Sequence, residues 1–125
     1  MKKAIISEKA PKAIGPYSHA VQVGDLYFLS GQTPAVPATG KLAEGGIKEQ
    51  TVQVFENIKA VLESQGMDMT NIVKTTVFLD DMSLFKEMNE VYATYFEGDY
   101  PARSAFAVKG LPMGALVEIQ CVATK

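Results

Sequence analysis

The spacing of apolar residues along the chain alternates between the period of a strand and the period of a helix. Near the start, short apolar or alternating runs predict strands at residues 4–6, 20–23 and 26–29. Gly24-Asp25 separates the second run from the third, and glycine in the first position of a two-residue loop is typical of a type II′ turn. We therefore expect a β-hairpin here, preceded by an irregular loop at residues 7–16.

Two later segments have helical spacing. The first follows a loop rich in proline and glycine at residues 33–46, begins at Ile47 and is closed by Gly66. The second is capped by Ser83 and ends before Gly98. The apolar positions of the two segments are Ile47, Val54, Phe55, Ile58, Val61 and Leu62, then Leu84, Phe85, Met88, Val91, Tyr92, Tyr95 and Phe96. Each set lies on one helix face, so both helices can cover one sheet.

Three further runs predict strands at residues 72–79, 103–109 and 115–124. The resulting order βββαβαββ predicts a two-layer α+β sandwich, in which both helices cover one face of a mixed six-stranded sheet. The last two strands either form a hairpin or lie on both sides of another strand. The chain has 125 residues, of which 47% are hydrophobic and 21% charged, and it suits a single domain over residues 1–125.

The sheet face away from the helices carries both apolar and polar residues. Alternation along residues 72–79 assigns Val73 and Val77 to the helix-covered face, and Ile72 and Phe78 to the opposite face. The opposite face then holds Ile72, Thr76, Phe78, Leu116, Gln120 and Val122. This set is too apolar to face water alone, so we expect a second or third copy of the chain to cover it.

Charge and hydropathy exclude several classes of partner. The net charge of −2 and the pI near 5.4 give no positive field, so nucleic acid is an unfavourable partner. Lys2 and Lys3 precede only a short apolar run, and no segment reaches the roughly 20 apolar residues that span a bilayer. These observations predict a cytoplasmic protein without a membrane partner.

Most sequence motifs of catalysis are missing. The chain has no phosphate-binding loop, no dinucleotide fingerprint and no paired cysteines, and one histidine and one cysteine leave no ligand set for a metal. We interpret His19 as a partly exposed histidine at a strand edge, with a role as base for Ser18 or Ser30 as the alternative. Cys121 is in phase with the apolar residues of the last strand, which predicts a buried, neutral thiol.

Arg103 and Glu118 are charged residues in otherwise apolar strands. A carboxylate in such a strand costs several kcal/mol to desolvate unless it meets a partner or lines a cavity. A hairpin of the last two strands would place both charges on one face, and an intervening strand would widen the gap to about 10 Å. The two residues therefore form a small-molecule site, a buried ion pair or a solvated sheet edge.

Several short motifs, in order along the chain, are similar to those of one protein family. They are Ala13-Ile14-Gly15-Pro16-Tyr17-Ser18, Leu29-Ser30-Gly31-Gln32, Val73-Lys74-Thr75-Thr76-Val77-Phe78, Asn89, Pro101-Ala102-Arg103-Ser104 and Val117-Glu118-Ile119. With these motifs the chain resembles the reactive-intermediate deaminases of the RidA (YjgF-type) family over nearly its whole length. The resemblance implies a homotrimer of chorismate-mutase-like subunits, with sheets inward, helices outward and clefts between subunits.

The resemblance also implies an activity, the hydrolysis of 2-imino acids and their enamine tautomers to 2-keto acids and ammonia, without a metal or organic cofactor. Arg103 matches the residue that binds the substrate carboxylate, and Glu118 matches the residue that orients and deprotonates the attacking water. Ala105 stands where many members have cysteine, so only its backbone carbonyl remains to hold that water. The residues that match other positions lining the pocket are Tyr17, Ser30, Gly31 and Asn89.

Two other functions are compatible with the same motifs. The trimer can be a non-catalytic module that binds small carboxylates or a protein in the same clefts, which the missing cysteine favours. The other is a ribonuclease or translation inhibitor, as attributed to some relatives. The acidic charge and the lack of a basic groove oppose this last function.

Overall fold

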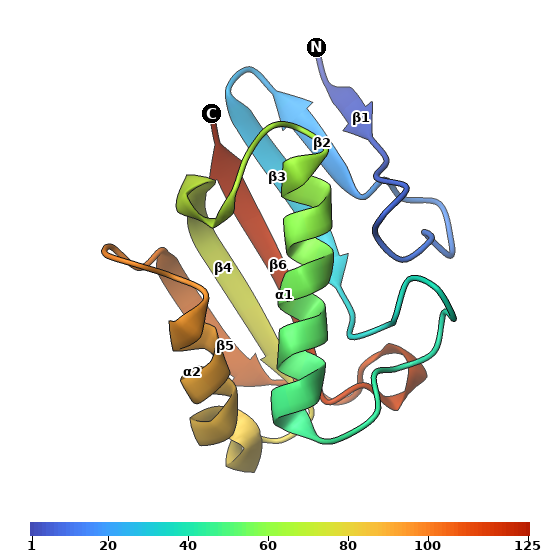
Figure 1. Ribbon diagram of the computed structural model, residues 1–125, viewed down its shortest axis with the longest axis vertical. Helices are drawn as coiled ribbons and strands as arrows, with labels where there is room; N and C mark the ends of the chain where they lie inside the picture. Colours follow the sequence, from blue (N-terminus) through green and yellow to red (C-terminus); the bar gives the residue numbers. More distant parts are fainter.

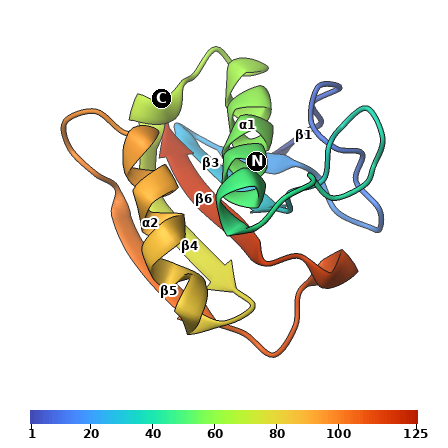
Figure 2. The ribbon, with the colours of Figure 1, turned by 60° about the horizontal axis from the view of Figure 1, so that its bottom comes forward.

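The computed structural model describes all 125 residues and places two helices on one face of a six-stranded sheet (Figures 1 and 2). The predicted α+β sandwich and the order βββαβαββ are confirmed. The elements are β1 (Lys3–Ile5), β2 (Ala20–Val23), β3 (Leu26–Gln32), α1 (Ile47–Glu63), β4 (Ile72–Leu79), α2 (Phe85–Thr94), β5 (Ala102–Ala107) and β6 (Val117–Thr124), with 3-10 turns at Met69–Asn71, Met82–Leu84 and Pro112–Gly114.

The strands lie in the order β1-β2-β3-β6-β4-β5. β2 and β3 form the predicted hairpin, in which Gly24 has a φ of 59° and Asp25 is not left-handed, the φ pattern of a type II′ turn. β4 and β5 pair in parallel, and α2 forms the crossover that such a pair requires. β6 pairs antiparallel with both β3 and β4. The last two strands are therefore not a hairpin, because β4 lies between them.

Local chemistry sets the bounds of the helices. At the start of α1, the Glu49 side chain accepts a hydrogen bond of 2.8 Å from the Gly46 N–H. Beyond its end, Gly66 takes a left-handed φ of 71°, as predicted for the residue that closes this helix. Ser83 does not cap α2, which begins at Phe85. Ser83 lies in the preceding 3-10 turn, which Asp81 caps by accepting a 2.8 Å hydrogen bond from the Ser83 N–H.

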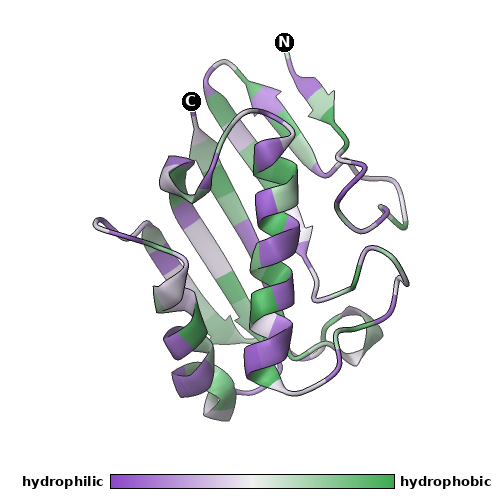
Figure 3. Ribbon diagram, viewed as in Figure 1, coloured by the Kyte–Doolittle hydropathy of each residue, from purple (hydrophilic) through white to green (hydrophobic).

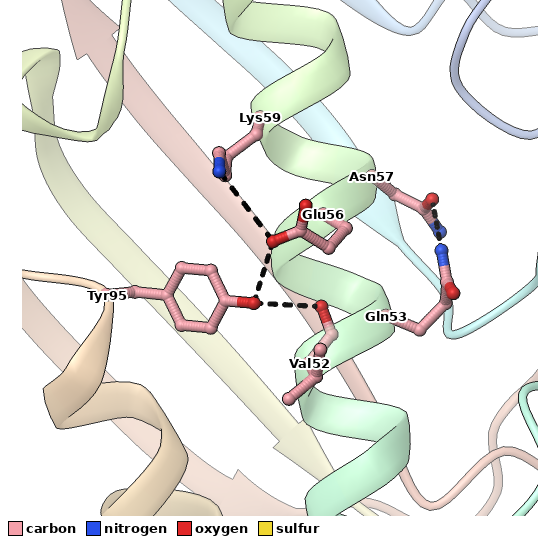
Figure 4. Close-up of polar contacts among 6 residues, drawn as sticks. All are labelled: Val52, Gln53, Glu56, Asn57, Lys59 and Tyr95. Atoms are coloured by element: carbon pink, nitrogen blue, oxygen red, sulfur yellow. Dashed lines mark hydrogen bonds and ion pairs between the residues drawn. The ribbon is translucent and has the colours of Figure 1, made fainter.

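The core lies between the helices and the sheet. From α1, the side chains of Val54, Phe55 and Ile58 are 0% exposed, whereas hydrophilic residues cover much of the outer side of both helices (Figure 3). The Tyr95 ring stacks on Phe55 with centroids 4.6 Å apart, and its hydroxyl donates a 2.8 Å hydrogen bond to Glu56 (Figure 4). Burial and the Glu56 carboxylate raise the pKa of this hydroxyl. Neither helix has the length and hydrophobicity needed to cross a membrane.

One irregularity changes the predicted faces of β4. The pairing of β4 with β6 shifts register between Ile72 and Lys74, so Val73 is an extra residue in its strand. Ile72 consequently turns into the core and is 6% exposed, while Val73 turns outward and is 43% exposed. The predicted faces of these two residues were wrong, because strict alternation makes no allowance for a bulge. Beyond it the alternation holds, and Val77 is buried.

The sheet face away from the helices stays uncovered within one chain (Figure 2). Phe28 and Phe106 are 46% and 45% exposed, which is high for aromatic side chains. Phe78 packs edge to face against Phe106 with ring centroids 5.6 Å apart. This open face thus carries an aromatic surface near the β5 edge and another ring on β3.

Candidate functional site

A pocket of about 630 Å³ lies where β3 ends and β6 begins, beneath the irregular loop before β2. Further parts of its wall come from the loop after β3 and from the turn at Pro112 and Met113. The predicted site residues that line it are Tyr17, Ser30, Gly31 and Glu118. The predicted site residues that do not line this pocket are Asn89, Arg103 and Ala105.

Glu118 has room beside β3 because Gly31 lacks a side chain. A Cβ atom on Gly31 would lie 2.9 Å from Cδ of Glu118, which is closer than real Cβ atoms approach other atoms, and 3.1 Å from Cγ, which is tighter than most real contacts. The Glu118 carboxylate forms neither of the salt bridges of the chain. Its partial burial raises the pKa of this carboxyl above the usual glutamate value. A carboxylate of this kind can accept a proton from a water molecule in the pocket.

α1 holds the far wall of the pocket in place. The side chain of Asn57, which is 1% exposed, donates hydrogen bonds of 2.9 Å to the Thr33 carbonyl and 2.8 Å to the Ala35 carbonyl. Its own oxygen accepts a 2.9 Å hydrogen bond from Gln53 (Figure 4). The buried amide of Asn57 thus fixes the start of the loop after β3 through both of its hydrogens. No apolar pattern in the sequence indicated this role of Asn57.

Arg103 lies beside α2, at the edge of the sheet. Its Nη1 donates a 2.6 Å hydrogen bond to the Asn89 side-chain oxygen. The guanidinium carbon lies 4.8 Å from the ring centroid of Tyr92 and 5.4 Å from that of Phe85. The Tyr92 hydroxyl is in turn 2.6 Å from the Thr75 hydroxyl, and burial raises its pKa. Aromatic faces and an amide thus hold a guanidinium whose other N–H groups can bind a planar anion.

Arg103 and Glu118 lie on opposite faces of the sheet. Arg103 pairs with Thr75 of β4, whereas Glu118 pairs with Phe78 of the same strand. Paired residues share a face and successive residues alternate, so positions 75 and 78 point in opposite directions. The predicted shared face and the buried Arg–Glu ion pair are therefore both wrong for one chain. β4 also separates the two strands, which adds a lateral gap of about 10 Å.

The predicted residues thus fall into two groups. Ala105 pairs with the buried Val77 and lies on the same face as Arg103. We call Asn89, Arg103 and Ala105 the arginine half, and Tyr17, Ser30, Gly31 and Glu118 the pocket half. The contribution of Phe85 and Tyr92 to the arginine half was not predicted, although the spacing of residues 85, 89 and 92 places them on one helix face.

His19 and Cys121 are both buried. The interpretation of His19 as partly exposed was wrong: it is 2% exposed, and both ring nitrogens lie within hydrogen-bond distance of main-chain atoms. This arrangement leaves no nitrogen to act as base for Ser18 or Ser30. Cys121 is 3% exposed, which confirms its predicted burial, and this burial raises its pKa to about 12. No group of three or more His, Cys, Asp or Glu side chains is placed to hold a metal ion.

Comparisons with known proteins agree with one another. A family model described as Endoribonuclease L-PSP matches residues 7–125. A RutC family protein of Pyrococcus horikoshii is 50% identical, over 100% of this chain and 99% of its own. A 2-iminobutanoate/2-iminopropanoate deaminase of Mus musculus is 46% identical, over 100% of this chain and 93% of its own. A crystal structure of a Rid family protein from Yersinia pestis has a TM-score of 0.96 and 45% identity, over 100% of both chains. The chain therefore belongs to the L-PSP endoribonuclease family, the YjgF/RidA family that its sequence motifs resemble.

Proposed function

We propose that this protein is a deaminase that hydrolyses 2-imino acids, and their enamine tautomers, to 2-keto acids and ammonia. The observation that carries the proposal is that the chain has two suitable groups. They are an arginine held in place by α2 and a partly buried glutamate without a salt-bridge partner. They suit the two ends of a small imino acid, its carboxylate and its imine carbon. The name of the mouse relative supports this reading.

In the proposed reaction, Arg103 binds the substrate carboxylate through two parallel N–H donors. Glu118 accepts a proton from water while the water oxygen bonds to the carbon of the protonated imine, whose C=N electrons move onto nitrogen. The proton then passes from Glu118 to that nitrogen. The C–N bond breaks as the new hydroxyl group loses its proton, which the departing ammonia carries away. A 2-keto acid and an ammonium ion are the products.

We infer further that each site combines the arginine half of one copy with the pocket half of another. One chain holds its two halves on opposite sheet faces, so a substrate can contact both only across a contact between copies. A contact that joins two different surfaces forms a closed ring when its rotation allows and an open filament when it does not, and the resemblance implies a ring of three. The exposed Phe28 and Phe106 supply apolar surface for such a contact.

A coupled assay tests the activity. When the purified protein is added to a threonine dehydratase with threonine, we expect faster formation of 2-ketobutyrate, because the dehydratase releases the imine. Arg103→Ala is expected to reduce this acceleration about 100-fold or more, since two charge-assisted hydrogen bonds are lost. Lys86→Ala, which removes an exposed charge from α2, is the matched control and should match the wild type.

Two results would contradict the deaminase. One is an unchanged rate of 2-ketobutyrate formation with the wild-type protein, and the other is full activity in Arg103→Ala. Binding of 2-ketobutyrate that requires Arg103 but brings no turnover would instead identify the non-catalytic module.

A mixing experiment tests the shared site. Arg103→Ala and Glu118→Gln are each expected to be inactive, and unfolding and refolding them together should restore activity. In trimers assembled at random from equal amounts, about a quarter of the sites combine two intact halves. Each variant refolded alone is the control. If the mixture stays inactive while the wild type regains activity after the same treatment, the two halves do not combine across copies, although the deaminase activity itself can still stand.

Ribonuclease activity, which the description of the family model names, has weaker support. The pocket wall contains one cationic side chain, Lys12, and the net charge of the chain is −2. A nucleic-acid groove normally offers several cations to the phosphate backbone. RNA cleavage that survives purification and disappears in Glu118→Gln would reverse this ranking.

A further inference from the structure

The loop between β1 and β2 forms one wall of the pocket without any regular secondary structure. Its tip has little support from its own chain, since Ile14 is 83% exposed and Tyr17 is 47% exposed. The main-chain hydrogen bonds within the loop are local, from Ala10 to Ser7 at 3.4 Å and from Tyr17 to Gly15 at 3.0 Å. Such bonds shape the loop but do not fix it against the sheet.

The side chain of His19 provides that attachment. Its Nδ1 accepts a 2.9 Å hydrogen bond from the Ser7 N–H, and its Nε2 lies 2.8 Å from the Pro11 carbonyl oxygen. Because Nδ1 accepts, the ring proton is on Nε2, which donates to Pro11. One neutral, buried imidazole thus joins both ends of the segment from Ser7 to Pro11. The main chain of His19 is itself attached to the pocket, since its carbonyl accepts a 2.9 Å hydrogen bond from the Ser30 N–H.

A second bond ties the other end of the loop to the same strand. The Ser30 hydroxyl donates a 2.7 Å hydrogen bond to the Ser18 carbonyl. The stretch from Lys12 to Tyr17 is therefore held at both ends, by the His19 ring at Pro11 and by Ser30 at Ser18. Of these two attachments, the His19 ring is the one nearer to Lys12 and Ile14, which also line the pocket.

We propose that His19 is a positioning residue that fixes the stretch from Lys12 to Tyr17 over the pocket. The hydrogen bond to Pro11 is the contact through which it acts. The inference rests on the proposed deaminase function. His19 does not touch the substrate in this role: it sets the loop that does. The bond from Ser7 serves to select the tautomer that donates to Pro11.

Two substitutions separate the bonds of the ring. Glutamine places an amide N–H near the position of Nε2, so His19→Gln keeps the donor to Pro11 and loses the acceptor for Ser7. Asparagine places an amide oxygen near Nδ1, so His19→Asn keeps the acceptor and loses the donor. We expect His19→Gln to retain the wild-type KM. We expect His19→Asn to raise KM about threefold to tenfold, the effect of one lost hydrogen bond, with a smaller change in kcat because Glu118 stays in place.

Amide hydrogen exchange gives a readout that needs no turnover. In His19→Asn, residues 12–18 should exchange faster while α1 and β6 keep their protection, and in His19→Gln the loop should match the wild type. A Tyr17→Ala background should reduce the effect of His19→Asn on KM, because Tyr17 is the side chain of this loop that the family resemblance assigns to substrate binding.

Several results would overturn the proposal. They are equal kinetic effects of the two substitutions, loop exchange that is unchanged in His19→Asn, or an undiminished effect in the Tyr17→Ala background. If His19→Asn does not fold, His19→Gln still decides, because a raised KM in that variant contradicts the role of Pro11. If the wild type proves not to be a deaminase, the exchange comparison still tests the attachment, so the two failures can be told apart.

Discussion

The Glu118→Gln variant is expected to lose about 10²- to 10⁴-fold in kcat, the range for removal of a positioned general base. Glutamine keeps the size of the side chain and one of its oxygens, but it cannot take a proton from water. Substrate binding through Arg103 should persist, so KM should change far less than kcat. Single-turnover rates with an enzymatically generated imine measure the loss. A variant within tenfold of the wild type would show that Glu118 is not the base.

The pH dependence of the wild type follows from the same carboxyl group. Only the carboxylate acts as a base, so kcat should rise with pH through the pKa of Glu118. Burial raises this pKa, and the rise should therefore lie above the usual glutamate range. In the free enzyme Arg103 of a neighbouring copy would oppose this shift, whereas in the complex the substrate carboxylate neutralises Arg103. The raised pKa is therefore expected in the pH profile of kcat more than in that of kcat/KM. The residual activity of Glu118→Gln should show no such pKa.

The Gly31→Ala variant is expected to lose most of its activity while keeping its fold. The added Cβ atom would lie 2.9 Å from the Glu118 carboxyl carbon, so the carboxylate has to move away. Gly31 does not have a left-handed φ, and the displaced group is the end of a flexible side chain. We therefore expect a loss of activity close to that of Glu118→Gln, with an unfolding free energy within about 1 kcal/mol of the wild type.

The control for this substitution is Gly110→Ala. A Cβ atom there meets nothing within 4 Å, and its φ is not left-handed, so activity and stability should both match the wild type. In the Glu118→Gln background, Gly31→Ala should cause no further loss, because its effect runs through the carboxylate. Equal and additive losses would instead indicate that Gly31 acts on the substrate directly. Thermal unfolding and the coupled assay on these variants supply the measurements.

The sequence predicted the helices and strands of the fold better than it predicted which strands pair with each other. α1 and α2 have an apolar face that repeats every helical turn, and the strands alternate, so both signals are local. Alternation does not indicate which strand pairs with which, and it left open whether β5 pairs with β6 or β4 lies between them. The faces of Arg103 and Glu118 depend on their partners in β4, Thr75 and Phe78, so the shared face that a hairpin would have given does not occur.

The motifs predicted which residues form the candidate site, but not how they are arranged. Nothing in the motifs separates the arginine half from the pocket half. His19 was misread because its partners, at Ser7 and Pro11, are main-chain atoms of an irregular loop, which leave no trace in a side-chain pattern. The same holds for Asn57, whose amide binds the carbonyls of Thr33 and Ala35. Polar contacts of this kind depend on the tertiary fold.

Cys121 gives the folded protein an unusual property in thiol chemistry. It is the one cysteine of the chain, it is 3% exposed, and its pKa of about 12 leaves little of the reactive thiolate at neutral pH. Alkylating reagents are therefore expected not to react with Cys121 in the folded chain, and to modify it only when the sheet opens. Incorporation of such a label counts molecules that have unfolded, without any engineered probe. A cysteine introduced on the surface would, for the same reason, be the single point at which a dye attaches.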